Sequence, residues 1–232
     1  MGVSVVTSSA AHSRIRHARA WLETRSPAEE ILILAATADA GNELARDVAR
    51  TKGAAFGWHR LSLAQFAAVL TAPLLATRGV ATLGNLGVQV MCARVVHKQA
   101  GDAALGRYSE IAVGPGFARA LSRVVTDLRL AKLNPDAVRI VAPDLVPLFE
   151  AYESNLTEGG FTDWAGVLTT ATDALISDSF TNPLLGLPTA LLDIAVTSEA
   201  ELSFVHALSL RTPELIVFAP SADERTLARA QH

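Results

Sequence analysis

Residues 31–44 read ILILAATADAGNEL, and this stretch decides the fold. The run from Ile31 to Leu34 is apolar at four consecutive positions, which is typical of a strand buried on both faces in a parallel sheet. Small residues follow, and Asp39 and Asn42 indicate a turn into a helix that carries Leu44. The stretch therefore predicts a strand–turn–helix unit, and open α/β sheets bind their ligands at the carboxyl end of such strands.

Other apolar runs predict further strands in the same sheet, and the segment from Leu74 to Leu133 has helical spacing throughout. We therefore expect an α/β fold in which helices flank a parallel sheet and an all-helical insertion interrupts it. The expected division is 1–73 for the first part of the α/β domain, 74–140 for the insertion and 141–232 for the second part. The additional strand runs are Val3–Val6, the strand end at Leu61–Leu63, Thr189–Leu192 and Leu215–Phe218, with a final helix from Ala222 onward.

Composition narrows the classes of protein to consider. Half of the 232 residues are hydrophobic and 19% are charged, so the chain can bury a sizeable core. The net charge of −3 argues against a strongly basic nucleic-acid-binding surface, although it leaves room for a local basic patch. Cys92 is the single cysteine and lies in a helical apolar pattern, which fits a core position in a reducing, cytoplasmic protein. The scattered histidines predict no metal site, and no apolar run is long enough to cross a membrane.

The first predicted strand, the polar residues 7–9 and the following helix have the layout of a phosphate-binding loop. When the pattern G-x-x-x-x-G-K-[ST] is placed on this turn, its four defining positions fall on Val6, Ala11, His12 and Ser13. Only Ser13 matches, and His12 offers neither the reach nor the charge of the lysine that binds phosphate. We therefore interpret the turn as at most a degenerate nucleotide-binding loop with His12 and Ser13 at its end, and the match at Ser13 favours a helix-start residue with a local hydrogen bond over a phosphate contact.

The second half of the helical segment carries several arginines. Arg119 and Arg123 lie one helical turn apart, and Arg129 follows further along the same helix. One hypothesis is that this face contacts a DNA phosphate backbone. The alternative is an ordinary solvent-exposed face with salt bridges, because Asp127 follows Arg123 at a spacing of four residues.

The order of these features resembles a known family. Residues 35–44 follow a hydrophobic strand and contain Thr37, Ala40 and Glu43 at the spacing T-x-x-A-x-x-E, and the predicted strand at Thr189–Leu192 ends in Asp193. This arrangement resembles the N-terminal helicase-like half of superfamily-one DNA helicases of the UvrD/Rep type. It is most similar to the AddB-type subunits of bacterial helicase–nuclease repair complexes. A second stretch similar to that family, Y-x-x-x-L followed by D-F-x-x-L-L, consists of Tyr152, Leu156, Asp163, Trp164 and Leu168.

The resemblance implies a P-loop-NTPase-like sheet, with residues 74–140 in the place of the helical insertion. It also implies a Walker-B-like role for Asp193 and DNA contacts for the motif-Ia-like residues Thr37 and Glu43. The sequence departs from the family at the catalytic positions, because Ile194 stands where active members have glutamate. Together with the missing lysine, this departure would remove the groups that hold and activate a triphosphate.

We therefore expect a catalytically degenerate helicase-like domain that acts as a scaffold or DNA-path module in double-strand-break repair and recombination. The expected partners are DNA and a helicase–nuclease partner subunit, without a membrane. Neither ATP nor magnesium is expected to bind tightly, and the chain is expected to be a fragment of a longer exonuclease subunit. Two alternatives stay open. One is an active ATP-binding domain of a helicase or nuclease subunit, and the other is a protein-interaction domain without DNA contact.

Overall fold

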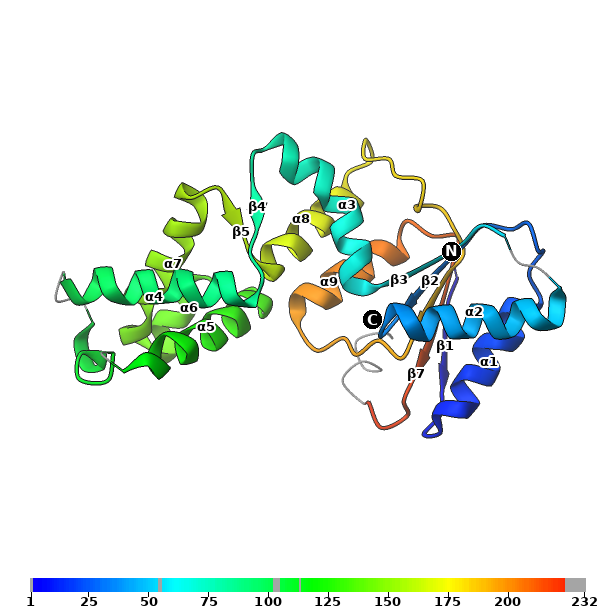
Figure 1. The fold of residues 1–232 in the computed structure, drawn as a ribbon, viewed down its shortest axis with the longest axis horizontal. Helices are drawn as coiled ribbons and strands as arrows, with labels where there is room; N and C mark the ends of the chain where they lie inside the picture. Colours follow the sequence, from blue (N-terminus) through cyan, green and yellow to red (C-terminus); the bar gives the residue numbers. More distant parts are fainter. Residues whose placement is uncertain (1, 54–55, 102–104, 113, 224–232) are drawn as a thin grey trace. The chain divides into compact units, whose positions relative to one another are not determined.

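The computed structural model describes residues 2–53, 56–101, 105–112 and 114–223 (Figure 1). Their contacts divide the chain into two units, which are described separately. The α/β unit consists of Met1–Leu70, Ala171–Thr197 and Glu201–His232, and the helical unit consists of Thr71–Thr170 and Ser198–Ala200. The final helix expected from Ala222 onward lies almost entirely outside the described residues.

The α/β unit is built on a five-stranded sheet in which every neighbouring pair is parallel. The strands are β1 (Gly2–Thr7), β2 (Ile31–Ala35), β3 (Trp58–Ser62), β6 (Thr189–Leu192) and β7 (Glu214–Ala219). Their spatial order is β1-β7-β6-β2-β3. The prediction of an α/β fold with a parallel sheet is confirmed, and all five residues of β2 are buried, as the run of aliphatic side chains predicts.

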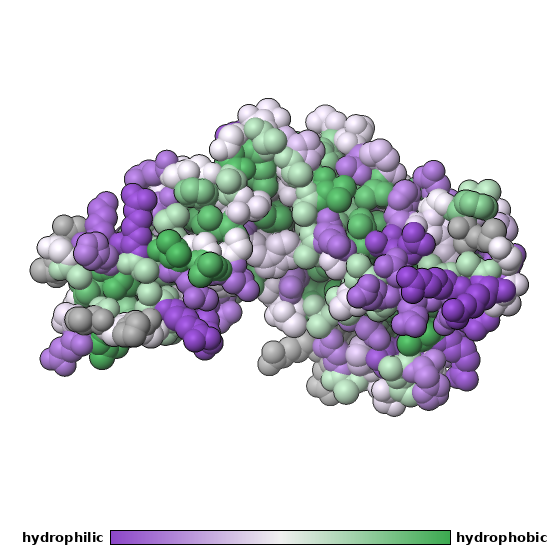
Figure 2. Space-filling view, viewed as in Figure 1, coloured by the Kyte–Doolittle hydropathy of each residue, from purple (hydrophilic) through white to green (hydrophobic). Residues whose placement is uncertain are grey.

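Helices cover both faces of this sheet. The helices α1 (Ala11–Glu23) and α2 (Ala38–Lys52) pack their apolar sides against Ile31 and Ile33 in one hydrophobic cluster. The first part of α3 (Leu63–Thr77) and the helix α9 (Glu199–Ser209) lie on the other side of the strands in Figure 1. The outward side of α2 is hydrophilic, and Figure 2 shows purple side chains gathered over it.

The connections define a point where the strand order reverses. The helix α1 joins β1 to β2 and α2 joins β2 to β3, whereas the chain then returns past β2 to β6 and continues through α9 to β7. Because crossovers between parallel strands are right-handed, the two directions of travel place their helices on opposite faces. The neighbouring strands β2 and β6 thus send their connections to opposite sides, and their carboxyl ends form the switch point at which open sheets bind ligands.

The helical unit has a hydrophobic core of its own. It contains α4 (Asn85–Gly101), α5 (Pro115–Leu130), α6 (Pro135–Val141) and α7 (Val146–Glu158), with two short 3-10 turns at Gly106–Tyr108 and Pro143–Leu145. The core is built from buried side chains of all four helices, and from α7 it takes Leu148, Phe149, Tyr152 and Leu156. The buried Cys92 belongs to this core, as predicted, and burial raises the pKa of its thiol to about 12.

Two expectations about this unit require correction. The insertion is not all-helical, because β4 (Ala81–Thr82) and β5 (Phe161–Thr162) form a parallel two-stranded sheet. Strands of two residues are too short to show an alternating pattern, so the sequence could not indicate them. The unit also continues to Thr170 rather than ending at residue 140, because α7 completes the core formed by α4 and α5. The helix α8 (Trp164–Ile176) begins in this unit and ends in the α/β unit.

No helix in the described ranges combines the length and the apolar character that a membrane span needs.

Candidate functional site

The turn after β1 is short and closed by hydrogen bonds. Only Ser8, Ser9 and Ala10 separate β1 from α1, and Val6, which takes the place of the first glycine of the phosphate-loop pattern, lies inside the strand and pairs with Phe218. The Ser8 amide donates to the carbonyl of Ala219 (3.3 Å), which fastens the turn to the end of β7. The structure describes all three turn residues, and none of them has a positive φ. The turn therefore lacks the alternation of right-handed and left-handed backbone conformations that forms an anion-binding nest.

A buried arginine reaches from the first turns of α1 to the end of β6. The Nε atom of Arg14 donates to Oδ1 of Asp193 (2.5 Å), and a terminal nitrogen donates to Oδ2 (3.2 Å). The other terminal nitrogen donates to the carbonyl of Ser8 (2.7 Å). Arg14 is 6% exposed, so its guanidinium is almost completely enclosed by the protein. All three nitrogens of this guanidinium are therefore used within the turn and the end of β6.

Asp193 is held in a conformation that non-glycine residues adopt rarely. Its φ is 52°, and its amide donates to the carbonyl of Phe218 (2.9 Å) at the end of β7. Aspartate tolerates the left-handed region better than most residues, and such conformations persist only where surrounding contacts fix them. The strand β7 lies between β1 and β6, so the Arg14–Asp193 pair joins segments on both sides of it. One ion pair therefore bridges the carboxyl ends of β1, β7 and β6.

Asp193 stands at the end of a strand that the sequence predicts, but the sequence does not indicate its partner. Arg14 follows Ser13, the only residue that matches the phosphate-loop pattern, and nothing in a single sequence signals a contact across 179 positions. His12 is exposed on the first turn of α1. The Ser13 hydroxyl accepts a hydrogen bond from Arg16 (3.4 Å), and its carbonyl bonds to His17. These local bonds agree with the interpretation of Ser13 as a helix-start residue.

The motif-Ia-like residues lie after β2 at the same edge of the sheet. Thr37 is the N-cap of α2, and its hydroxyl accepts a hydrogen bond from the amide of Ala40 (3.2 Å). Glu43 is exposed one turn further along the helix. The preceding Ala36 amide donates to the carbonyl of Leu192 (3.0 Å), so the ends of β2 and β6 are linked directly. Thr37 thus has a structural role as a cap, and the side chain of Glu43 faces solvent.

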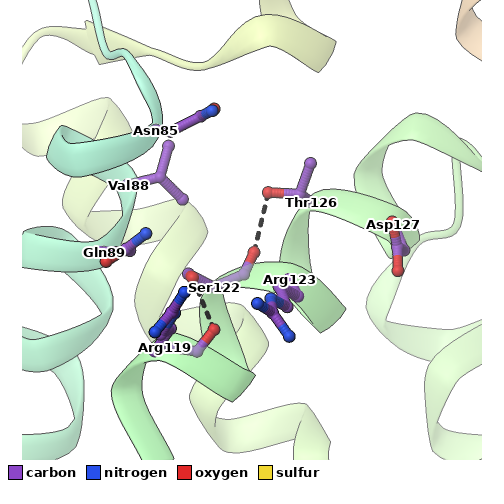
Figure 3. A pocket seen from close by; sticks show the side chains of 8 residues that line it. All are labelled: Asn85, Val88, Gln89, Arg119, Ser122, Arg123, Thr126 and Asp127. Carbon is purple, nitrogen blue, oxygen red and sulfur yellow. Dashed lines mark hydrogen bonds between the residues drawn. The ribbon is translucent and has the colours of Figure 1, made fainter. Parts of the chain in front are cut away.

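In the helical unit, Arg119 and Arg123 border a groove between α4 and α5 with a volume of about 480 Å³ (Figure 3). Both arginines are exposed, and no ion pair of the described residues involves either of them. The salt bridge between Arg123 and Asp127, which the spacing allowed, does not form within the part of the chain that the structure describes. The remaining lining consists of Asn85, Val88, Gln89, Ser122, Thr126 and Asp127.

Arg129 does not belong to this groove, which corrects its assignment as a DNA-backbone contact. Its Nε donates to Asp163 (2.7 Å), and a terminal nitrogen donates to Glu153 (2.7 Å). Asp163 is 3% exposed and also accepts hydrogen bonds from the hydroxyl of Tyr152 (3.1 Å) and the amide of Gly166 (3.0 Å). Burial, followed by the nearby Asp163 carboxylate, raises the pKa of the Tyr152 phenol. The guanidinium of Arg129 is therefore committed to a structural network that ties α5, α7 and the start of α8 together.

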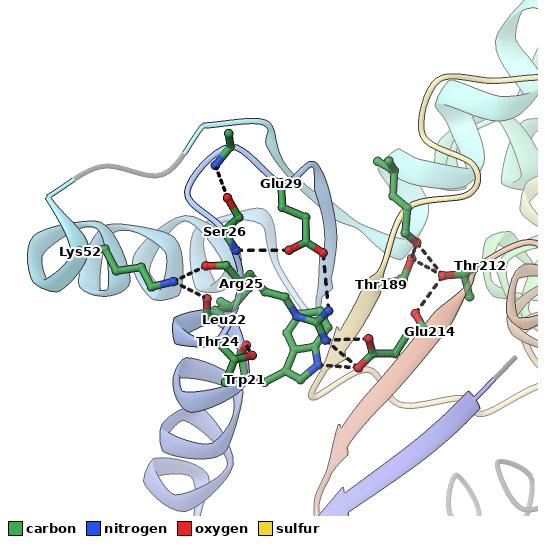
Figure 4. A network of polar contacts seen from close by, with 12 residues as sticks. Trp21, Leu22, Thr24, Arg25, Ser26, Glu29, Lys52, Thr189, Thr212 and Glu214 are labelled. Atoms are coloured by element: carbon green, nitrogen blue, oxygen red, sulfur yellow. Dashed lines mark hydrogen bonds and ion pairs between the residues drawn. The ribbon is translucent and has the colours of Figure 1, made fainter.

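A second polar network lies at the amino ends of the strands (Figure 4). Arg25 donates two hydrogen bonds of 2.7 Å to the carboxylate of Glu214, and the indole nitrogen of Trp21 donates a third (2.9 Å). The guanidinium also lies 4.2 Å from the centre of the Trp21 ring. The hydrogen bonds from Arg25 lower the pKa of Glu214 against the opposing effect of burial. This network joins the end of α1 to the start of β7 and lies at the edge opposite the Arg14–Asp193 pair.

The sequence matches no protein-family model, and no curated protein matches it. Among the residues that the structure describes, no group of three or more histidine, cysteine, aspartate and glutamate side chains is arranged to hold a metal ion. The site is therefore defined by its geometry alone. In the α/β unit that geometry consists of a carboxyl edge bridged by Arg14 and Asp193. In the helical unit it consists of a groove with two arginines that have no ion-pair partner among the described residues.

Proposed function

We propose that this chain is a catalytically silent helicase-like module, of the superfamily-one type that AddB-type repair subunits exemplify, and that it serves as a scaffold or DNA path without hydrolysing ATP. The proposal rests on one observation, which is the bidentate ion pair between Arg14 and Asp193. In an active enzyme of this class, the aspartate after the corresponding strand assists the magnesium ion, and the preceding turn wraps the phosphates. Here an arginine of the chain itself neutralises that aspartate.

The residues at this edge do not fit magnesium and a triphosphate. A magnesium ion at Asp193 would have to displace the guanidinium of Arg14, which would then be left buried without its carboxylate. The three-residue turn has no backbone nest for phosphate, and Val6 pairs within the sheet instead of forming the loop. These features support a P-loop-like fold that keeps its strand arrangement while an internal ion pair replaces the ligand.

The partners we propose are DNA and a second subunit of a helicase–nuclease complex. Support for DNA comes from Arg119 and Arg123, which have no carboxylate partner in the described chain and face a polar groove. Exposed cations without internal partners are available to neutralise phosphates. Support for a partner subunit comes only from the resemblance of the sequence.

Isothermal titration of the chain with ATP and magnesium tests the proposal directly. We expect no saturable heat and no phosphate release above the spontaneous rate, for the wild type and for Asp193→Asn alike. Micromolar binding together with hydrolysis would contradict the proposal. An additional loss of that affinity in Asp193→Asn would establish the alternative, in which Asp193 serves a working nucleotide site. A Ser9→Ala variant controls for changes in the turn that leave the ion pair intact.

A further inference from the structure

The groove between α4 and α5 offers hydrogen-bond donors on both of its walls. The amides of Asn85 and Gln89 come from α4, and the guanidinium groups of Arg119 and Arg123 come from α5 (Figure 3). None of these four side chains takes part in a hydrogen bond or ion pair within the described residues. From this arrangement, and resting on the proposed function, we propose that the groove binds the sugar–phosphate backbone of double-stranded DNA and that Asp127 limits the path of the backbone along α5.

The chemistry of the lining fits phosphate oxygens. Protein contacts to the DNA backbone come mainly from arginine, lysine, serine, threonine, asparagine and glutamine, and six of the eight lining residues belong to these types. Two of the six have no proton to donate, because the Ser122 hydroxyl donates to the carbonyl of Arg119 and the Thr126 hydroxyl donates to the carbonyl of Ser122 (both 2.8 Å). The donors that remain for a ligand are the two amides and the two guanidinium groups, which suits an acceptor-rich ligand such as phosphate.

The distribution of charge in the helical unit favours the same ligand. Apart from Arg129, which is paired with Glu153 and Asp163, the helices α4 and α5 contain four basic residues and one acidic residue. The helix α7 contains three acidic residues and no basic one. The unit is therefore basic on the helices that border the groove, although the chain as a whole carries a net charge of −3. A local basic face of this kind attracts a polyanion to one place on an otherwise acidic protein.

The lining favours a duplex over a single strand. Proteins that bind single strands without sequence preference stack the bases on aromatic side chains beside a basic groove. The eight residues that border this groove, all of them described, include no aromatic side chain, and Val88 is the only apolar one. A duplex presents its phosphates outward and keeps its bases stacked internally, so it needs only the backbone contacts that this groove supplies.

The carboxylate of Asp127 sets the limit of the proposed contact between the DNA backbone and α5. It borders the groove on α5, is exposed, and has no basic partner within the described chain. Figure 3 shows it apart from the guanidinium groups of Arg119 and Arg123. Its carboxylate would repel a phosphate that continued along α5, and removal of its charge should therefore strengthen binding rather than weaken it.

The test is fluorescence anisotropy of the full chain with a labelled duplex DNA at several salt concentrations. The double variant Arg119→Ala/Arg123→Ala should weaken binding by about tenfold for each arginine and should reduce the slope of log affinity against log salt by about two units. Arg94→Ala is the matched control, because Arg94 is an exposed arginine of α4 outside the lining and should have a much smaller effect. Asp127→Asn should increase the affinity.

Several results would overturn this inference. Equal losses in Arg94→Ala and in the groove variants would mean that only overall charge matters. Tighter binding of single-stranded DNA than of the duplex, or displacement of the duplex by polyglutamate at equal charge, would remove the assignment to a duplex backbone. If the wild type bound no DNA, the DNA-path part of the proposed function would fail as well, whereas DNA binding that ignores the groove variants would remove this inference alone. Circular dichroism confirms that each variant is folded.

Discussion

At the scale of single residues, the pair of Arg14 and Asp193 determines what the carboxyl edge of the sheet can do. A carboxylate at the end of a buried strand needs a cation or hydrogen-bond donors, because removal from water penalises its charge. An arginine supplies both from within the chain, and its planar fork matches the two carboxylate oxygens. The edge therefore folds without an external cation, and any ligand that needs Asp193 must compete with a preformed intramolecular partner.

The Arg14–Asp193 pair leads to a prediction about stability. Asp193→Asn leaves the guanidinium of Arg14 buried without its counter-charge, and we expect a loss of about 2–4 kcal/mol in the free energy of unfolding. The loss should lie toward the lower end because 29% of the Asp193 side chain is exposed. Urea denaturation measures this loss. The variants Arg14→Ala and Asp193→Asn should be clearly less than additive when combined, and additive losses would show that the two side chains are not coupled.

At the scale of elements, the network around Glu214 fixes how the end of α1 meets the start of β7. Trp21 and Arg25 come from α1 and the residues after it, and they bind one carboxylate on the strand. Lys52, at the end of α2, donates hydrogen bonds to the carbonyls of Leu22 and Arg25. Two helices and one strand are thus joined at the amino edge of the sheet by contacts between residues that are remote in sequence.

The lowered pKa of Glu214 predicts a dependence of stability on pH. A carboxyl group with a folded pKa below its ordinary value of 4.5 stabilises the fold above that value, and the stabilisation is lost as the pH falls through the folded pKa. Glu214→Gln should therefore lower the melting temperature near neutral pH, and its difference from the wild type should shrink in acid below pH 4.5. Thermal melts across this range measure the effect. Glu43→Gln is the control, and a difference for Glu214→Gln that is constant with pH would contradict the prediction.

At the scale of the whole molecule, each of the two units has a hydrophobic cluster of its own among the described residues. One cluster consists of residues from the sheet and from α1 and α2, and the other lies between Val88 and Leu156. The second core uses only residues of the helical unit, which is a nearly continuous segment of the chain. The α/β unit instead needs strands from both sides of that segment, because β6 pairs with β2.

This division predicts that residues 71–170 fold when they are expressed alone. Among the described residues their core is built from side chains of this segment itself. The fragment should therefore have the far-ultraviolet signature of a helical protein and should unfold cooperatively on heating. Phe149→Ala, at a fully buried position, should destabilise the fragment by about 3–5 kcal/mol. A gradual melt that this substitution does not change would show that the unit depends on the rest of the chain.

Local signals in the sequence accounted for most of the elements. The strand β2 was predicted from its aliphatic run, and the strand end expected at Leu61–Leu63 falls at the junction of β3 and α3, where Ser62 and Gln65 exchange hydrogen bonds. Asp163 caps α8 locally by accepting a hydrogen bond from the amide of Gly166, three residues further along the chain. The sequence also placed Asp193 at the end of a buried strand. Such features depend on residues within a few positions of each other, and the order of side chains records those interactions directly.

The amino-acid sequence by itself determined the α/β class, the buried strands and the absence of a lysine and glycines from the turn after the first strand. Only the tertiary structure decided that Arg14 neutralises Asp193 and that Arg129 is enclosed by Glu153 and Asp163. It also decided that Arg119 and Arg123 have no ion-pair partner among the residues that the structure describes. The reason is physical. Whether a charge is paired depends on which side chains the fold brings within hydrogen-bond distance, and for Arg14 and Asp193 that neighbour lies 179 positions away.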